Sequence, residues 1–310
     1  MSDGPFFAGI DGGGTKTLVV IVDERGQERA RIRSDTSNAA IIGHENAASV
    51  LKQAMIQSAR EANASLPLAA AWFGLSGSDR PDDHRQLQPA LKALARSIHM
   101  TNDAELLLAG LPERVGVALV AGTGSIAFGV NRAGQRARAG GWGHIFSDEG
   151  SGYDLARKML KAFALEADGR GPSTSITSRL TNHFELGDPH QIINHVYAPT
   201  MTKGDLAALS RIVLEEADAG DEMATGIVSS TASEMAELAH TVASRLHFKS
   251  EFNLAVTGGL FIHQAMFRLG VLGTLGRTWT IPTITIVDDP ALTAARALAT
   301  SREGSNAEGH

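Results

Sequence analysis

The chain of 310 residues contains no cysteine. That absence excludes disulfides, iron–sulfur clusters and cysteine-ligated zinc sites. It also suits a reducing compartment. The amino terminus lacks the basic region and apolar core of a signal peptide, and no apolar run approaches the ~18 residues of a membrane span. We therefore expect a cytoplasmic protein with no membrane partner.

A strong charge of one sign is also lacking. The net charge is −6 and Lys and Arg form no basic block, so nucleic acid is not an expected partner. The 11 histidines show no metal-ligand spacing, because His44-Glu45 has no second His four residues on, as a zincin motif requires. Hydrophobic residues make up 43% of the chain, which is usual for a globular protein of one large or two medium domains.

A glycine-rich turn occurs twice in similar surroundings. Asp11-Gly12-Gly13-Gly14-Thr15 lies between two apolar runs, and so does Ala121-Gly122-Thr123-Gly124-Ser125. In the alignment of the two copies, Gly12 matches Gly122 and Thr15 matches Ser125. Glycine lets backbone approach a ligand closely, and successive free N–H groups bind anions such as phosphate. One copy alone is equally compatible with a hairpin turn, but the duplication predicts two related domains that grip one anionic ligand.

Two familiar phosphate-binding motifs do not fit the first turn. Gly9 and Gly14 have the spacing of a P-loop, but Thr15 stands where that motif needs Lys, and a strand is expected to follow instead of a helix. The third glycine of the dinucleotide fingerprint is missing as well. The turn is therefore expected to bind phosphate in a different fold.

The first half of the chain is predicted to have the element order βββαβαβ, with three antiparallel strands over residues 5–33, and the second half, which begins near Glu105, is predicted to repeat this three-strand opening. The first half should continue with a helix over 44–63, a strand over 69–75, a helix over 82–96 and a strand over 97–101. The second should continue with helices over 150–165 and 222–246, strands over 252–256 and 279–287, and a last helix from Asp289-Pro290 to about Thr300.

These elements predict an amino-terminal domain over residues 1–103 and a second domain over 104–288 that carries a helical insertion. The last helix, 289–301, is expected to pack back on the first domain. Residues 302–310 are expected to form a disordered tail. The Ala-rich helices leave room for a homodimer face but do not identify one.

Several segments resemble one family. Gly140-Gly141-Trp142-Gly143-His144, followed by Asp148-Glu149-Gly150-Ser151, is similar to the sugar-binding signature of the N-acetylglucosamine kinases. Thr101-Asn102-Asp103-Ala104 resembles their catalytic-aspartate segment and Ser37-Asn38 their sugar-contacting loop. These kinases form part of the BadF/BadG-type group in the actin, Hsp70 and sugar kinase superfamily. The resemblance covers roughly residues 1–300.

The resemblance implies an α/β fold of two duplicated ribonuclease-H-like (actin-like ATPase) domains, each with a βββαβαβ core, around an interdomain cleft. It implies transfer of a phosphoryl group from ATP, with Mg²⁺, to the 6-hydroxyl of an amino sugar. N-acetylglucosamine is the first expected substrate and glucosamine the alternative. Ser147 stands where many relatives carry Gly, so the acyl group tolerated at C2 is open, as are affinities, pathway and oligomeric state.

Asp103 is the implied catalytic base, which accepts the proton of the sugar hydroxyl. From the residues alone it is also a candidate helix N-cap, because Asn102-Asp103 precedes an Ala/Leu run. Asp11 is the implied magnesium ligand, although an Asx turn would also explain it.

The implied ATP-binding residues come from three loops. The backbone N–H groups of Gly13 and Gly14, together with Thr15 and Lys16, are expected to meet the β- and γ-phosphates, although Lys16 is equally compatible with a solvated surface charge. The full implied set is Gly12, Gly13, Gly14, Thr15 and Lys16, then Gly122, Thr123 and Gly124, and on the adenosine side Gly258 and Gly259.

The implied sugar-binding residues are Asn38, Asp103, Gly141, Trp142, Gly143 and Asp148. Fixed polar partners are needed because an unpaired buried sugar hydroxyl is costly. Each has a simpler alternative: Asn38 as a loop residue in a left-handed conformation, Asp148 as the cap of the helix near Gly150, and Trp142 as core.

A second function from a different class is a non-catalytic regulator that responds to sugar or nucleotide, because one fold hosts many functions. A regulator would be expected to lack the catalytic aspartate or to carry a DNA-binding module. The chain keeps Asp103 and has no basic extension, so the kinase is favoured.

Overall fold

The computed structural model describes residues 4–76 and 81–307. The chain divides into two compact units: unit 1 is Met1–Arg114 with Val287–His310, and unit 2 is Val115–Ile286. The first boundary lies further along the chain than the predicted end at residue 103. The reason is packing, because Leu106 is buried in a core cluster of unit 1 and a Cβ on Gly74 would lie 2.3 Å from it.

Unit 1 is built on a five-stranded mixed sheet of order β3-β2-β1-β4-β5. The first three strands pair antiparallel, whereas β1, β4 and β5 run parallel. This is the predicted βββαβαβ order. The strands are β1 (Phe7–Gly12), β2 (Thr17–Val22), β3 (Glu28–Ser34), β4 (Leu68–Leu75) and β5 (Ala95–Thr101).

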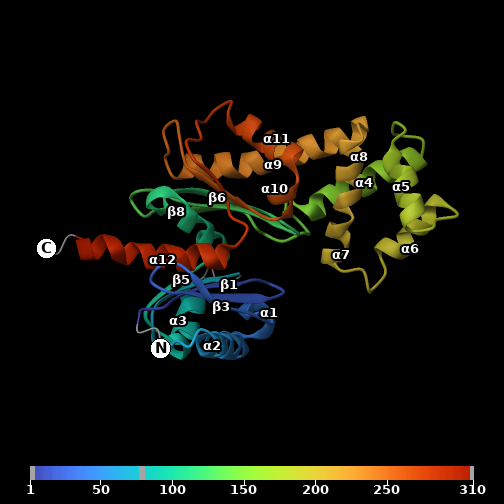
Figure 1. Cartoon of the computed structure of the whole chain (residues 1–310). Coiled ribbons are helices and arrows are strands. Elements are labelled where there is room, and N and C mark those ends of the chain that lie inside the picture. Colours follow the sequence, from blue (N-terminus) through green and yellow to red (C-terminus); the bar gives the residue numbers. More distant parts are fainter. Residues whose placement is uncertain (1–3, 77–80, 308–310) are drawn as a thin grey trace. The chain divides into compact units, whose positions relative to one another are not determined.

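Helices cover both faces of the unit 1 sheet, and Figure 1 shows α2 and α3 on one face and α12 on the other. Ala8 and Ile10 of β1 join the cluster that contains α2 residues, while Phe7 joins the cluster that contains α12 residues. Because both faces of the sheet are buried at its centre, the central strands β1, β2 and β4 are mostly apolar along their length, whereas β3 and β5 at the edges carry charged and polar residues. The helical elements are α1 (Ala39–Ile42), α2 (His44–Glu61), α3 (Pro81–Leu91), η1 (Asp103–Gly110), η2 (Pro112–Arg114) and α12 (Pro290–Ala307).

Gly9 allows α12 to lie directly against β1. A Cβ at this position would stand 1.9 Å from the carbonyl oxygen of Ala291, far inside van der Waals contact. The side chains of Ala291, Ala294 and Ala295 are likewise small and fully buried at this contact. Small residues on both elements therefore set the distance at which the last helix completes unit 1.

Unit 2 repeats the same sheet, with order β10-β9-β6-β7-β8 and the same pattern of parallel and antiparallel pairs. The predicted duplication is confirmed at the level of topology. Its turns differ in length, however: Gly12 pairs with Thr17 in the first hairpin, and Ala121 with Ser125 in the second. Ser125 therefore opens its strand as Thr17 does, so the alignment of Ser125 with Thr15 is wrong. The strands are β6 (Gly116–Ala121), β7 (Ser125–Val130), β8 (Arg136–Gly140), β9 (Leu254–Thr257) and β10 (Ile284–Ile286).

The insertion between β8 and β9 is helical, as predicted, and α9 is the longest of its helices at 24 residues. Buried side chains of α4, α8 and α9 form one core cluster with β6. The helices of unit 2 are α4 (Gly152–Ala167), α5 (Ser175–His183), η3 (Pro189–Gln191), α6 (Ile192–Val196), α7 (Lys203–Ala208), α8 (Ser210–Asp218), α9 (Glu222–Arg245), α10 (Gly259–His263) and α11 (Ala265–Leu275).

Three predicted element boundaries differ from the observed ones by more than two residues. The helix expected to end at residue 96 ends at Leu91, because Ala95 already pairs with Leu68 of β4. The strand expected over 279–287 is shortened to β10, since only Ile284–Ile286 pairs with β9. Helix α12 continues to Ala307, past the predicted end near residue 300, as one more hydrogen bond accompanies each added residue. Residues 302–307, which were predicted to belong to a disordered tail, are part of this helix, and residues 308–310 of the predicted tail lie outside the described residues.

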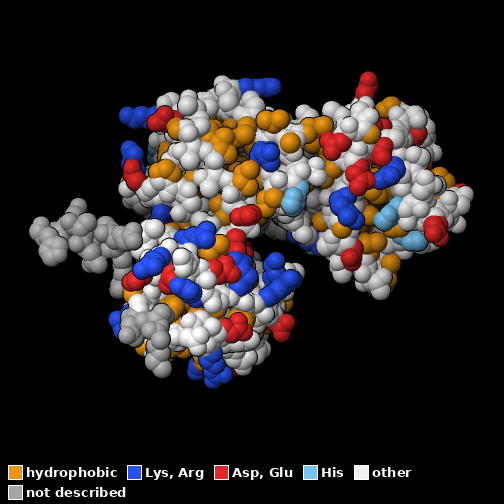
Figure 2. All heavy atoms as spheres, in the orientation of Figure 1, with side chains coloured by type: hydrophobic (Ala, Val, Ile, Leu, Met, Phe, Trp, Pro, Cys, Tyr) orange, Lys and Arg blue, Asp and Glu red, His pale blue; other side chains and the backbone are white. Residues whose placement is uncertain are grey.

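Charges of both signs are interspersed over unit 1 in the face that Figure 2 shows. Arg31, for example, pairs with both Glu28 and Asp289. Among the described residues, no helix combines the length and the apolar character that a membrane crossing needs.

We predict that Gly9→Ala destabilises the protein by about 1–3 kcal/mol, because the added methyl group must push α12 away from β1. The measurement is the free energy of unfolding in urea. Gly226→Ala is the matched control: it adds the same methyl group to the exposed side of α9, where nothing lies within 4 Å. It should stabilise by about 0.5–1 kcal/mol. Equal effects of the two substitutions would contradict the packing account.

Candidate active site

The carboxyl ends of β1, β4 and β5 meet at one edge of the unit 1 sheet, because these three strands are parallel. Asp11 and Gly12 end β1, and the N–H of Ser76, just after β4, donates to the Gly12 carbonyl at 2.8 Å. Asp103 follows β5 and opens η1. Asp11 and Asp103, which are 92 positions apart in the sequence (103 − 11), therefore lie at the same edge of the sheet.

The first glycine turn is closely packed at its base and open at its tip. A Cβ on Gly12 would lie 2.5 Å from Ser37 Oγ and 2.6 Å from Leu75 Cδ2, so any larger residue would force these two side chains to move. The Gly13 N–H donates to the Lys16 carbonyl inside the turn. The remaining turn residues, Gly14, Thr15 and Lys16, are exposed. The Gly13 N–H is thus already used within the turn, and the exposed part of the predicted phosphate contact is Gly14 to Lys16.

Asp11 lies in a negative environment. Its own burial and then the neighbouring carboxylate of Asp103 raise the pKa of Asp11 to about 6, with Asp289 adding to the rise and Lys16 opposing it. The ionised carboxylate is therefore costly in this position, and a cation would relieve that cost. The described residues contain no group of three His, Asp or Glu side chains placed to hold a metal ion by themselves.

Asp289 is a member of this environment whose electrostatic role was not predicted from sequence. It was expected only to open the last helix. It does cap α12, accepting from the Leu292 N–H at 2.8 Å, and it also pairs with Arg31 at 2.6 Å. Its influence on Asp11 depends on how α12 packs against β1, a long-range contact that leaves no local signal in the sequence.

The N-cap of η1 is Asn102, whose Oδ1 accepts from the Ala104 N–H at 2.7 Å. Asp103 is the first residue inside this helical segment, and its Oδ1 accepts from the same N–H at 2.9 Å. Asp103 is partly buried, whereas Asn102 is buried. Asn102 is therefore the N-cap of η1. Capping does not explain why a carboxylate stands at position 103.

Asn38 is the N-cap of α1, with φ of −71°. The left-handed alternative for this residue is therefore wrong. Its Oδ1 accepts from the Ala40 N–H at 3.0 Å, and its backbone N–H donates to Thr36 Oγ1. Thr36 Oγ1 donates in turn to the Gly13 carbonyl. The predicted sugar loop is thus hydrogen-bonded directly to the first glycine turn.

In unit 2 the predicted ATP-binding loops converge in the same way. Gly258 has φ of +97°, and a Cβ there would lie 2.2 Å from the Ala121 carbonyl oxygen. Gly122 donates to the Gly124 carbonyl within its turn and accepts from Gly152, the first residue of α4. Gly259 faces open space. The carboxyl ends of parallel β6 and β9 therefore bring together two loops that are far apart in sequence.

Asp148 is buried, with φ of +67°. Its Oδ1 accepts from the Ser125 N–H at 3.3 Å, and its Oδ2 lies 2.7 Å from Lys203 Nζ. The cap of α4 is Ser151, so the capping alternative for Asp148 is wrong. A carboxylate has about four acceptor positions, so these two contacts do not use its full capacity, although only 4% of the side chain is exposed. Lys203 was missed from sequence, because 55 residues separate it from Asp148.

Trp142 is exposed, at 62%, so the alternative that it fills the core is wrong. The guanidinium of Arg138 lies 4.7 Å from its ring centre, an arrangement that favours a cation–π contact. Gly141 and Gly143 both have positive φ. A Cβ on Gly141 would press on Ile126, at 2.8 Å, whereas nothing lies near a Cβ on Gly143. Ile145 and Phe146, three and four residues further on, are exposed as well.

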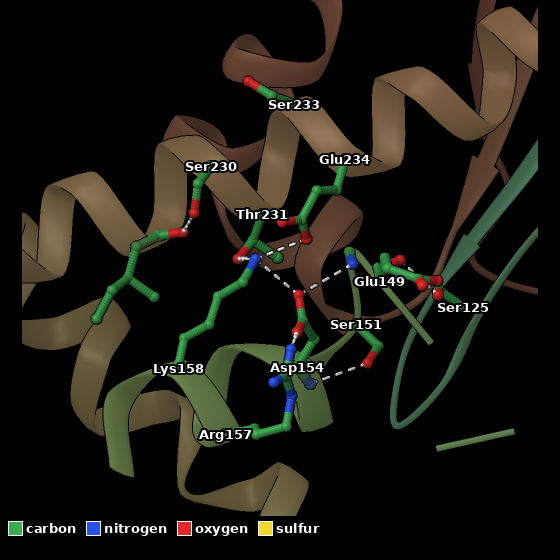
Figure 3. Close-up of polar contacts among 12 residues, drawn as sticks. Ser125, Glu149, Ser151, Asp154, Arg157, Lys158, Ser230, Thr231, Ser233 and Glu234 are labelled. Atoms are coloured by element: carbon green, nitrogen blue, oxygen red, sulfur yellow. Dashed lines mark hydrogen bonds and ion pairs between the residues drawn. The ribbon is translucent and has the colours of Figure 1, made fainter. Parts of the chain in front are cut away.

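The segment before α4 is held by an ionic cluster around the buried carboxylate of Asp154, which Figure 3 shows. Lys158 Nζ lies 2.8 Å from Asp154 Oδ2 and 2.6 Å from Glu234 Oε2. Although burial opposes it, the bonds from Lys158 and Arg157 lower the pKa of Asp154. Asp154 also accepts from the Gly150 N–H, at 3.4 Å. The cluster thus ties the end of the sugar-signature loop to α4 and α9.

A cavity of about 690 Å³ lies elsewhere in unit 2, beside α4 and α6. Its lining is mainly apolar and includes Leu160, Phe163, Ile193 and Val196. None of the predicted ATP- or sugar-binding residues lines it, so we do not assign it to the substrates.

Sequence comparison gives clear relatives. The model of the BadF/BadG/BcrA/BcrD ATPase family matches residues 8–270. An N-acetylmuramic acid/N-acetylglucosamine kinase of Clostridium acetobutylicum is 32% identical over 263 residues, which cover 84% of this chain and 86% of the relative. An N-acetyl-D-glucosamine kinase of Dictyostelium discoideum is 34% identical over 269 residues, covering 82% and 84%.

Structure comparison agrees on the fold. A ROK family glucokinase of Streptomyces griseus, solved in complex with glucose and AMPPNP, matches with a TM-score of 0.57 at 15% identity, over 96% of this chain and all of the other. At that identity the likeness concerns the fold alone. It confirms the predicted α/β class with two related, actin-like ATPase units.

We predict that Asp11→Asn gains stability relative to the natural protein as the pH rises. The carboxyl of Asp11 has a pKa of about 6 when folded and about 3.9 when unfolded, so the folded state binds more protons between these values. Its stabilising contribution is full below about pH 4 and is lost as the pH passes about 6. Asn stays neutral throughout.

The free energy of unfolding should be measured in urea without metal, at about pH 4 and about pH 8. The difference between variant and natural protein should grow by about 2 kcal/mol over this range. Any structural effect of the amide changes the free energy of unfolding by the same amount at both pH values. A difference that is constant with pH would therefore contradict the raised pKa.

Proposed function

Because the chain belongs to the BadF/BadG/BcrA/BcrD ATPase family, we propose that it transfers a phosphoryl group from ATP to the 6-hydroxyl of an amino sugar, with N-acetylglucosamine as first substrate. The observation that carries the proposal is the meeting of Asp11, the first glycine turn and Asp103 at one sheet edge. At this edge, Asp11 is the proposed carboxylate for the metal ion, the first glycine turn is the proposed contact for the phosphates, and Asp103 is the candidate base.

Asp103 is the proposed general base. It accepts the proton of the 6-hydroxyl as that oxygen attacks the γ-phosphorus, and the electron pair of the broken bond leaves with ADP. The transition state of such a transfer is loose, so the protein acts mainly by positioning and electrostatics. Asp103 is only partly buried, and a carboxylate has about four acceptor positions, so its bond from the Ala104 N–H does not exclude a contact with the substrate.

Asp11 fits the proposed magnesium site. Its pKa is raised by burial and by Asp103, so a divalent cation would offset the repulsion that the carboxylates create. Mg²⁺ is usually held by one or two carboxylates together with substrate phosphates and water, which agrees with a single Asp at the turn. When bound, the ion would neutralise charge on the ATP phosphates.

The remaining roles are divided between the two units. For ATP we propose the exposed tip of the first turn in unit 1, and in unit 2 the turn Gly122–Gly124 and the loop at Gly258-Gly259. For the sugar we propose Asn38, Trp142 and Asp148, with backbone contacts at Gly141 and Gly143. Trp142 supports this role by its exposure, and Asn38 by its link to the first turn. A cytoplasmic location is proposed with it, since ATP is the co-substrate.

The first experiment is a coupled ADP-release assay with ATP and Mg²⁺ over N-acetylglucosamine, glucosamine, N-acetylmannosamine, N-acetylmuramic acid and glucose. We expect turnover with N-acetylglucosamine and little with glucose, because the site is proposed to recognise the substituent at C2. Turnover with glucosamine alone would replace the acetylated substrate by the free amine. No turnover with any of these sugars by a folded, ATP-binding protein would favour the regulator.

We expect Asp103→Asn to lower kcat by ~10²–10⁴-fold, as loss of a positioned base does. The dissociation constant for the sugar should change little, because the amide keeps the size of the side chain. Asp218→Asn makes the same change at the exposed end of α8 and is the control. Equal kcat in Asp103→Asn and in the control would remove Asp103 from the mechanism.

A further inference from the structure

Lys203 lies beside the second glycine turn. It is the first residue of α7, in the helical insertion, and its Nζ is 2.7 Å from Asp148 Oδ2. A Cβ built on Gly124 would stand 3.1 Å from the same Nζ. The ammonium group is therefore in close reach of the Gly124 backbone, although the two residues are 79 positions apart (203 − 124).

The position of Lys203 is well supported. Thr202 caps α7, and a reciprocal bond from the Thr202 N–H to Asp205 completes a capping box. On the other side, a Cβ on Gly152 would lie 3.4 Å from the Ala207 carbonyl oxygen, so α7 lies close to the start of α4. The side chain of Lys203 is only 32% exposed. It is a placed cation and not a freely solvated surface charge.

The hydrogen-bonding capacity of Lys203 is only partly used. An ammonium group has three N–H donors, and within the part of the chain that the structure describes Lys203 donates to Asp148. With 32% of its surface exposed, the side chain can be approached by a ligand. Asp148 is also fixed to the turn through the Ser125 N–H. Asp148 therefore holds the ammonium group next to the turn without occupying all of its donors.

We propose that Lys203 is a further catalytic residue, which contacts the phosphoryl group held at the turn Gly122–Gly124 while that group is transferred. The inference rests on the proposed kinase function. As the bond from the γ-phosphorus to the β,γ-bridging oxygen breaks and the bond to the sugar oxygen forms, negative charge is carried by the phosphoryl oxygens. A fixed ammonium group at this point stabilises that charge more than it stabilises bound ATP.

The test compares Lys203→Gln with Lys203→Arg. Gln removes the charge but can still donate a hydrogen bond to Asp148, whereas Arg keeps the charge. We expect kcat to fall ~10²–10³-fold in Lys203→Gln, as for loss of one transition-state donor, and to stay within about tenfold in Lys203→Arg. Lys249→Met, at an exposed position after α9, is the control for loss of a positive charge.

A second measurement separates catalysis from structural support. ADP with tetrafluoroaluminate mimics the transferred phosphoryl group, so its affinity in the presence of sugar should fall ~10²-fold in Lys203→Gln. The affinity for ADP alone should stay nearly unchanged. If both affinities fell by the same factor, or if kcat in Lys203→Gln matched the natural protein, the proposal would be overturned.

The natural protein is measured first in the same assay. Its turnover with an amino sugar tests the proposed function independently of Lys203. If Lys203→Gln does not fold, Lys203→Met, which has a longer apolar stem, takes its place. The same comparison then decides: the loss of affinity for ADP with tetrafluoroaluminate against the loss of affinity for ADP alone.

Discussion

The arrangement of the candidate site depends on one constraint: parallel strands end at the same edge of a sheet. In unit 1 this rule brings Asp11 of β1 and Asp103 after β5 together. In unit 2 it brings the turn after β6 next to Gly258 after β9. Loops carry the chemistry, but the sheets decide which loops can meet. Because the topology is duplicated, each unit offers one glycine turn at its functional edge.

Glycine residues allow close packing around the candidate site in each unit. Gly9 admits α12, and α12 brings Asp289 into the electrostatic environment of Asp11. Gly12 admits Ser37, and the neighbouring loop joins Thr36 and Asn38 to the first turn. In unit 2, Gly124 leaves space for the pair formed by Asp148 and Lys203. Stability and function are therefore connected, since a substitution that loosens the packing at these glycines would also move the charged side chains of the candidate site.

The sequence was informative where patterns are local. Alternating or continuous apolar runs, the two glycine turns and the start of α12 at Pro290 were predictable, and the duplicated βββαβαβ order follows from them. Residues joined only by tertiary contact were not predictable. Lys203 reaches Asp148 across 55 positions, and Asp289 affects Asp11 through helix packing. The end of α3 was misplaced for the same reason, because pairing of Ala95 with Leu68 overrides the helical pattern.

The central claim is that Asp11 and Asp103 form one electrostatic unit, and the most direct test is an NMR titration of ¹³C-labelled aspartate carboxyls in the metal-free protein. The signal of Asp11, assigned through its loss in Asp11→Asn, should titrate with a pKa of about 6. In Asp103→Asn the pKa of Asp11 should fall, because the neighbouring charge is gone. An Asp11 pKa near the ordinary value of about 3.9, or one that Asp103→Asn leaves unchanged, would contradict the account.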